Sequence, residues 1–173
     1  MGIMGAMPEE IDEILSIMKE KEQVELGGRI YHKGKIGNAN VVVVFSRWGK
    51  VAASSTATSL IHIFNISELI FTGVAGALTD DIKVGDIILG ERLFQHDMDA
   101  QPLMKKFEIP LLGISFFEPA SERVGLAMEQ LESVFQPNSS YPMALAEFLS
   151  QSGKMVYLPT LRKGIIASGD VFF

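Results

Sequence analysis

Two carboxylates follow a short apolar segment at the start of the chain. Residues 2–7 are apolar or small, and Pro8, Glu9 and Glu10 come directly after them. Proline and early carboxylates are typical of the first turn of a helix, where acidic side chains complement the helix dipole by about 0.3–1 kcal/mol. A carboxylate just beyond the carboxyl end of a strand also lies where open α/β sheets bind ligands. These residues alone leave a structural and a catalytic interpretation open.

Three further motifs have residue types that could take part in chemistry. Residues 72–77, with the sequence TGVAGA, form a glycine-rich turn after an apolar stretch, and such a turn is either structural or a phosphate cradle. Residues 167–173, ASGDVFF, end in two phenylalanines that would also suit the end of a core strand. His96, Asp97 and Asp99 are metal-ligand types, but no second ligand cluster accompanies them, and zinc sites usually need three or four ligands. We expect no metal and no cofactor.

Alternating strands and helices must position these motifs. Apolar or β-branched runs predict strands at residues 2–7, 29–36, 41–46, 68–72, 85–89 and 164–168. The second and third form a hairpin, and the strands at 41–46 and 68–72 are expected to be buried. Apolar periodicity predicts a helix after Pro8 with Lys19 and Glu20 on its polar side, and helices at 49–64, 121–135 with Ser121 as a candidate cap, and 142–152. Residues 101–118 have no clear period. This order is typical of an α/β domain with a mixed sheet.

Composition limits the function classes. A chain of 173 residues with 47% apolar content suits one core, so a single domain over residues 1–173 is expected. The net charge of −6 argues against nucleic acid as a partner, and the absence of cysteine excludes disulfides and cysteine nucleophiles. No apolar run approaches the roughly 20 residues of a membrane helix, and residues 1–20 lack the features of a signal peptide. We expect a cytoplasmic protein that binds no membrane.

Together with residues 46–51, SRWGKV, these motifs occur in an order that resembles the bacterial 5′-methylthioadenosine/S-adenosylhomocysteine nucleosidases over the whole chain. The resemblance implies a three-layer nucleoside phosphorylase-like fold with a central mixed β-sheet flanked by helices. It implies a purine nucleosidase that releases adenine and a 5-thioribose product. It also implies that the C-terminal part of the fold, with the general acid and the ribose-binding glutamate, follows Phe173. Residues 1–173 alone are therefore expected to be an incomplete domain, inactive and less stable than the whole fold.

The resemblance assigns Glu10 as the residue that activates the hydrolytic water. It implies substrate contacts for Val74, Ala75 and Gly76 on the ribosyl side, for Trp48 beside the 5′-substituent, for Phe172 as the ring that stacks on the purine, and for Phe173 as the residue whose backbone recognises the purine edge. Related phosphorylases have an arginine before the glycine-rich turn, whereas this chain has Phe71-Thr72, so water is favoured over phosphate as the nucleophile.

Three alternatives to this function stay open, one in the substrate and two in the function class. Relatives commonly have a small aliphatic residue at the position of Trp48, so aminodeoxyfutalosine is an alternative substrate. A non-catalytic nucleoside-binding remnant and a phosphorylase are the other two alternatives.

The small-residue helix at 51–59 and the apolar loop after Asp99 favour a homodimer, as the resemblance also implies, with Leu103 and Phe107 as candidate contacts to the neighbouring subunit.

Overall fold

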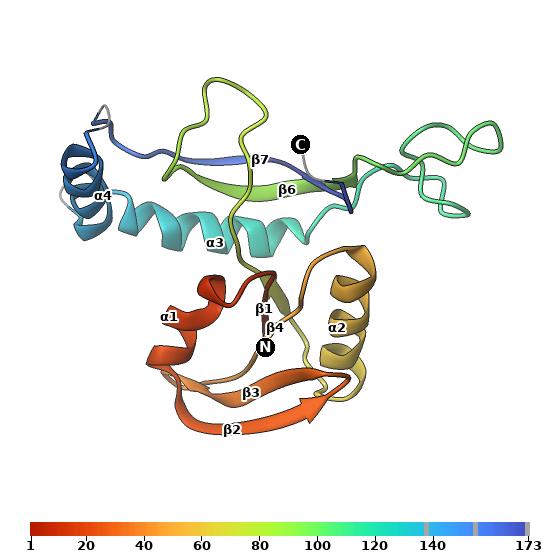
Figure 1. Ribbon diagram of the computed structural model, residues 1–173, viewed down its shortest axis with the longest axis horizontal. Coiled ribbons are helices and arrows are strands. Elements are labelled where there is room, and N and C mark those ends of the chain that lie inside the picture. The colour runs from red at the N-terminus through yellow and green to blue at the C-terminus, as the bar shows by residue number, and fades with distance from the viewer. Residues whose placement is uncertain (137–138, 154–155, 172–173) are drawn as a thin grey trace. The chain divides into compact units, whose positions relative to one another are not determined.

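The computed structural model describes residues 1–136, 139–153 and 156–171, and Figure 1 shows its ribbon. The chain divides into two compact units, Met1–Gly76 and Ala77–Phe173. Each unit has its own sheet and helices, so each is described by itself. The single domain expected over residues 1–173 stays a prediction.

Unit 1 is built on a five-stranded mixed sheet. Its strands lie in the order β2-β3-β4-β1-β5. Their bounds are β1 (Gly2–Gly5), β2 (Lys19–Leu26), β3 (Arg29–Ile36), β4 (Ala39–Phe45) and β5 (Leu69–Phe71). The strand β1 pairs in parallel with β4 and β5, whereas β3 pairs antiparallel with β2 and β4. The predicted mixed sheet and the predicted hairpin are therefore confirmed.

Two helices cover the two faces of this sheet. Side chains alternate between the faces of a strand, and the four buried valines of residues 41–44 supply both cores. On one face Val41 and Val43 pack with Ile11 of α1 (Glu9–Ile17). On the other face Val42 and Val44 pack with Leu60 of α2 (Lys50–His62). Figure 1 shows α1 and α2 on opposite sides of β1 and β4, which confirms the expected layers of helix, sheet and helix.

The first helix is shorter than its sequence predicts. It ends at Ile17, so Lys19 and Glu20 lie in β2 and not on a polar helix face. The strand β2 was missed because it is an edge strand with almost no apolar residues, and edge strands are commonly charged. Its acidic side chains face lysines of β3 across the pair, with Glu22 3.0 Å from Lys33 and Glu20 2.7 Å from Lys35.

The fifth strand is exposed, which is a second difference from the sequence prediction. Residues 68–72 were expected to form a buried strand, yet Leu69, Ile70 and Phe71 are all exposed. The reason is position, because β5 is the other edge of the sheet and pairs only with β1. An apolar run therefore indicated a strand correctly but not its place in the sheet.

Unit 2 pairs two long parallel strands, β6 (Ile87–Gln95) and β7 (Leu161–Ser168), and has the helices α3 (Ser121–Val134) and α4 (Ser140–Gln151). The prediction that Ser121 caps α3 is wrong, because Ala120 is the N-cap residue and Ser121 is already helical. Residues 101–118 form turns with an isolated bridge between Ile109 and Ile114. Within the residues described above, no helix is both long and apolar enough to span a membrane.

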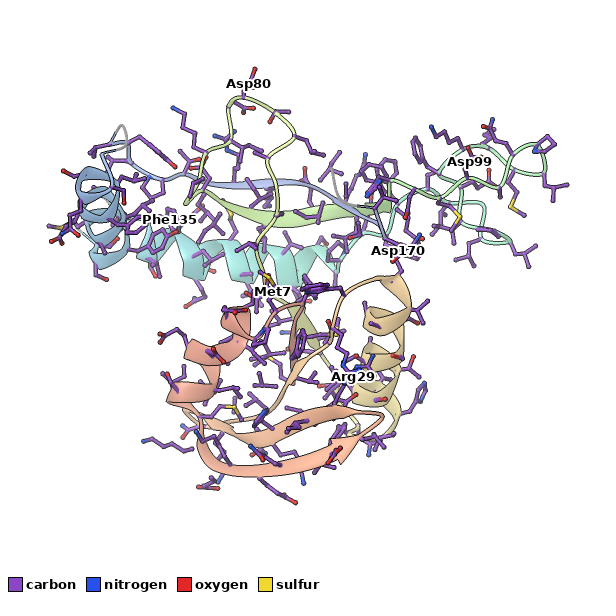
Figure 2. All side chains as sticks on the ribbon, in the orientation of Figure 1. Met7, Arg29, Asp80, Asp99, Phe135 and Asp170 are labelled. Atoms are coloured by element: carbon purple, nitrogen blue, oxygen red, sulfur yellow. The ribbon has the colours of Figure 1, made fainter. Side chains whose placement is uncertain are left out.

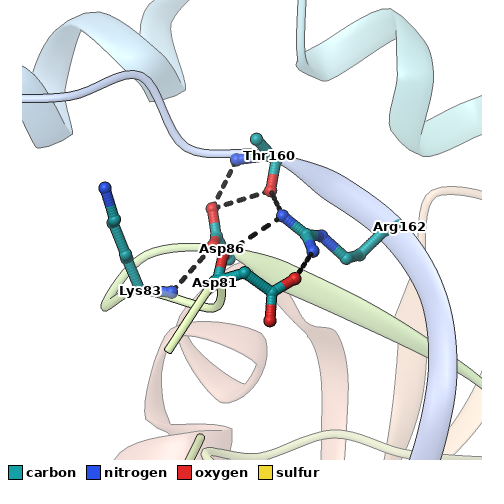
Figure 3. A network of polar contacts seen from close by, with 5 residues as sticks. All are labelled: Asp81, Lys83, Asp86, Thr160 and Arg162. Atoms are coloured by element: carbon teal, nitrogen blue, oxygen red, sulfur yellow. Dashed lines mark hydrogen bonds and ion pairs between the residues drawn. The ribbon is translucent and has the colours of Figure 1, made fainter. Parts of the chain in front are cut away.

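A polar network ties the starts of β6 and β7 together (Figure 3). One oxygen of Asp86 accepts hydrogen bonds from the N–H of Thr160 at 2.6 Å and from its hydroxyl at 2.9 Å. The other oxygen accepts the N–H of Lys83 at 2.8 Å. Arg162 pairs with Asp81 at 2.6 Å and also donates to the Thr160 hydroxyl. Asp86 therefore acts as a structural link between segments 74 residues apart.

Replacing Asp86 by asparagine is expected to destabilise the protein by about 1 kcal/mol at pH 7. The asparagine NH2 group would face one of the N–H or O–H donors that the Asp86 carboxylate now accepts, and that hydrogen bond would be lost. Burial raises the pKa of the Asp86 carboxyl, but the hydrogen bonds from Lys83 and Thr160 and the charge of Arg162 together hold this pKa below its ordinary value. A depressed pKa stabilises the fold above the unfolded pKa of about 3.9, and the gain is lost as pH falls through the folded pKa.

The difference in unfolding free energy between Asp86→Asn and the unmodified protein should therefore shrink as the pH falls below about 4. Urea unfolding at several pH values measures it. The exposed neighbour Asp80 provides the control, since Asp80→Asn should leave stability nearly unchanged. Equal stability of Asp86→Asn and the unmodified protein at pH 7 would contradict the structural role.

Candidate active site

Glu10 is held by backbone N–H groups from two segments that are distant in sequence. Its Oε2 accepts the N–H of Ala6 at 2.6 Å and that of Met7 at 3.0 Å. Its Oε1 accepts the N–H of Val74 at 2.9 Å. Glu10 is half-buried, whereas the adjacent Glu9 is exposed. The two carboxylates of the opening motif therefore have different surroundings, and only Glu10 faces the glycine-rich segment.

The short strand β1 explains how Glu10 reaches this position. β1 ends at Gly5, and Pro8, with a φ of −55°, is the N-cap residue of α1. Glu10 therefore lies in the first helical turn, where its side chain turns back toward the N–H groups of the preceding bend. Figure 2 labels Met7 in this bend. Backbone N–H groups before and within the first turn of a helix lack partners inside the helix, so they are available to a carboxylate.

Two glycines leave the space that the carboxylate fills. A Cβ on Gly73 would lie 2.7 Å from Oε1 and 2.8 Å from Cδ of Glu10. A Cβ on Gly5 would lie 2.8 Å from Cγ2 of Ile11 and 3.3 Å from Oε2 of Glu10. Separations below 3.0 Å force a shift of one group, so Gly73 is required for close approach. The sequence signal was a glycine at or near the end of a strand in each motif, but the motifs alone did not show that these glycines share one neighbour.

The strands beside β1 bring two further segments to the same edge of the sheet. Ser46 follows β4 and donates its N–H to the carbonyl of Gly5 at 2.8 Å. Thr72 follows β5 and donates its N–H to the carbonyl of Met4 at 3.0 Å. Because these strands are parallel, the loop with Trp48 and the glycine-rich segment both leave the edge that carries Glu10.

The structure describes four of the six predicted substrate-binding residues. Val74 contacts Glu10 through its backbone, and its side chain is 77% exposed. Ala75 and Gly76 continue the same exposed segment. Trp48 is 67% exposed on the loop after β4. Phe172 and Phe173 lie outside the described residues.

The string of residues 96–99 contacts the last motif of the chain. His96 donates its N–H to the carbonyl of Ser168 at 3.0 Å, and Asp97 accepts the N–H of Asp170 at 2.8 Å. These contacts extend the parallel pairing of β6 and β7 beyond both strand ends. Among the residues that the structure describes, no group of three or more His, Asp or Glu side chains is placed to hold a metal ion.

Comparisons with known proteins match nearly the whole chain. The aminodeoxyfutalosine nucleosidase of Helicobacter pylori is 36% identical over 172 residues, which are 99% of this chain and 64% of that protein. Among solved structures, an H. pylori 5′-methylthioadenosine/S-adenosylhomocysteine nucleosidase with butyl-thio-DADMe-Immucillin-A matches with a TM-score of 0.76 and 33% identity. The match covers 99% of this chain and 64% of that one.

A second solved structure is the nucleosidase of the same name from Colwellia psychrerythraea 34H, in complex with adenine. It matches with a TM-score of 0.80 and 28% identity over 99% of this chain and 62% of that chain. The chain therefore spans slightly less than two thirds of the length of these relatives. The comparisons confirm the resemblance inferred from the motifs and the nucleoside phosphorylase-like fold. The family model described as "Phosphorylase superfamily" matches residues 1–173, and the chain thus belongs to the phosphorylase superfamily.

Proposed function

We propose that this protein is an N-ribosyl hydrolase that cleaves 5′-methylthioadenosine and S-adenosylhomocysteine into adenine and the corresponding 5-thioribose product. The single observation that carries the proposal is the Glu10 carboxylate, held at the carboxyl end of β1 against the N–H of Val74. The printed names of the relatives support the substrate class. The Phe71-Thr72 pair before the glycine-rich segment supports water, rather than phosphate, as nucleophile.

In this proposal Glu10 is the general base. A carboxylate offers about four lone-pair directions. The two lone pairs of Oε2 accept the N–H groups of Ala6 and Met7, and one lone pair of Oε1 accepts the N–H of Val74. The second lone pair of Oε1 is left for a water molecule. That oxygen takes the proton while the water oxygen bonds to C1′ and the bond to the purine breaks. The three N–H groups hold the carboxylate in one orientation, so it needs no rearrangement before it takes the proton.

The remaining predicted residues bind substrate in this proposal. Val74, Ala75 and Gly76 line the ribosyl side, Trp48 lies against the 5′-substituent, Phe172 stacks on the purine, and the Phe173 backbone contacts the purine edge. The exposure of Val74 and Trp48 supports these assignments, because a side chain must be accessible to contact a substrate. We assign protonation of the leaving purine to none of the residues 1–173.

Aminodeoxyfutalosine is the second candidate substrate. The observation in its favour is that a relative 36% identical over 172 residues has the name aminodeoxyfutalosine nucleosidase. The large Trp48 ring is a second reason, because it changes the shape available to a 5′-substituent. The base chemistry of Glu10 is the same for either nucleoside.

Release of adenine by the complete gene product tests the proposal. Each of the three nucleosides is supplied with and without phosphate, and chromatography measures adenine and the sugar product. Hydrolysis predicts a free sugar at a rate that phosphate does not change. A phosphorylated sugar would identify a phosphorylase, and binding without adenine release would identify a non-catalytic nucleoside-binding protein.

We also propose that the protein acts as a homodimer in the cytoplasm. The helix α2 exposes Val51 at 81%, although its opposite side packs on the sheet through Leu60. The loop after Asp99 exposes Leu103 at 88%. Phe107 instead packs edge-on against Phe94 with ring centres 5.8 Å apart, so it supports this loop from within. In this proposal these two exposed apolar side chains lie in contacts with the neighbouring subunit.

Sedimentation of the complete gene product at micromolar concentration should give the mass of a dimer. Replacing Val51 by glutamate places a charge in the proposed contact and should weaken the dimer by about tenfold or more, since removing a charge from water without a partner is costly. Gln130→Glu, on the exposed side of α3, is the matched control and should leave the dimer intact. A monomer at these concentrations would refute the homodimer.

A further inference from the structure

Arg29 joins three backbone segments of unit 1. From β3, its Nε donates to the carbonyl of Ser46 at 3.1 Å, and its Nη1 donates to the carbonyl of Gly27 at 3.0 Å. Its Nη2 donates to the carbonyl of Ala52 at 3.4 Å and to Oγ of Ser55 at 3.1 Å. Figure 2 shows Arg29 beside α2. One side chain therefore holds the turn before β3, the residue after β4 and the first turns of α2 together.

The loop between β4 and α2 is held at the two residues before Trp48. Ser46 is buried, and its hydroxyl donates to the carbonyl of Arg47 at 2.8 Å. Arg47 has a φ of 68° and donates its guanidinium to the carbonyl of Gly28. Trp48 directly follows these two anchored residues, and its ring is exposed.

These contacts need the shape of arginine as well as its charge. Guanidinium presents five N–H donors in a rigid plane, and Arg29 uses donors on all three of its nitrogens. A lysine ammonium is a single point with three donors and cannot span these separated acceptors at once. Replacing Arg29 by lysine would keep the charge but release part of the loop.

We propose that Arg29 is a positioning residue for Trp48, and that through Trp48 it sets which 5′-substituents the site accepts. The positioning half of this inference, that Arg29 holds the Trp48 loop, does not depend on the proposed function. The substrate half, that Arg29 thereby selects the 5′-substituent, rests on the proposed function. Glu10 is held by other groups, namely the N–H groups of Ala6, Met7 and Val74. Loss of the Arg29 contacts therefore moves the wall of the 5′-substituent pocket and leaves the base in place.

Fluorescence tests the positioning half without any substrate. Trp48 is the single tryptophan of these 173 residues, and Trp48→Phe provides the blank for any other signal. In Arg29→Lys, the fluorescence anisotropy of Trp48 should fall, because the loop has lost part of its anchoring. Arg92→Lys is the matched control, since Arg92 forms an exposed ion pair with Glu118 at 2.9 Å in unit 2.

Kinetics of the complete gene product test the substrate half. The ratio of kcat/KM for S-adenosylhomocysteine to that for 5′-methylthioadenosine should change by about tenfold in Arg29→Lys, mainly through KM, because the two substrates differ only in the 5′-substituent. The kcat for 5′-methylthioadenosine should stay within about twofold. Ser55→Ala removes one of the four Arg29 contacts and should shift both measurements in the same direction by less.

Each outcome decides one half of the inference. Unchanged anisotropy in Arg29→Lys overturns the positioning role, whatever the activity. A lower anisotropy with an unchanged substrate ratio, or an equal fall in kcat for both nucleosides, overturns the role in specificity. If Arg29→Lys does not fold, the same criteria apply to Ser55→Ala. If the unmodified protein hydrolyses neither nucleoside, the proposed function fails, and the fluorescence result still decides the positioning role.

Discussion

Glu10→Gln should lower kcat for nucleoside hydrolysis by about 10²–10⁴-fold, the usual contribution of a positioned acid or base. Glutamine has nearly the same shape as glutamate, but its amide cannot take a proton from water. Its single amide oxygen can accept the N–H groups of Ala6 and Met7 while its NH2 group faces Val74, so two of the three hydrogen bonds should remain and the site should largely keep its form. Initial rates of adenine release measure kcat, and calorimetric titration with a non-hydrolysable nucleoside analogue measures binding, which should change little.

Glu9→Gln is the matched control for this prediction. Glu9 is adjacent, has the same charge and lies in the same first turn of α1, but its side chain is exposed. Removing the Glu9 charge should affect activity only by changing the electrostatic potential near the site, so we expect kcat to change by less than about threefold. A Glu10→Gln protein with nearly normal kcat, or one whose loss Glu9→Gln matches, would remove Glu10 as the base.

Local patterns predicted most of unit 1. The β-branched run at 41–46 indicated a buried strand, and the structure buries Val41 to Val44 against both helical layers. Apolar, proline and acidic residues in succession indicated the passage from β1 to α1. These features are visible in sequence because their causes, side-chain alternation and helix-start chemistry, act within a few residues.

The features that were missed depend on partners far along the chain. The strand β2 has almost no apolar residues, and its pairing with β3 is what makes it a strand. The carboxylate of Glu10 is held by backbone N–H groups, which every residue except proline carries, so no residue type marks them. Arg29 gave no signal either, because its four acceptors are three carbonyls and one hydroxyl from separate segments.

Gly73→Ala should lower kcat/KM by about 100-fold, since a shift of about 1 Å in a catalytic group can cost that much. The added Cβ would lie 2.7 Å from Oε1 and 2.9 Å from Oε2 of Glu10, so either the carboxylate or the glycine-rich segment must move. A shift in either one lengthens the hydrogen bond from Val74, which now measures 2.9 Å. Gly73 has no unusual φ, so the effect comes from the close approach and not from backbone strain.

Two measurements distinguish a displaced base from a damaged fold. Thermal unfolding shows whether Gly73→Ala still folds, and the fall in kcat/KM should exceed anything that the loss of stability explains. Gly125→Ala is the control, because a Cβ there meets nothing within 4 Å and alanine in α3 should stabilise the helix by up to about 1 kcal/mol. The double variant Glu10→Gln/Gly73→Ala should be little worse than Glu10→Gln alone, because both changes act on one carboxylate. Additive losses would instead mean that Gly73 serves the reaction by a route that does not pass through Glu10.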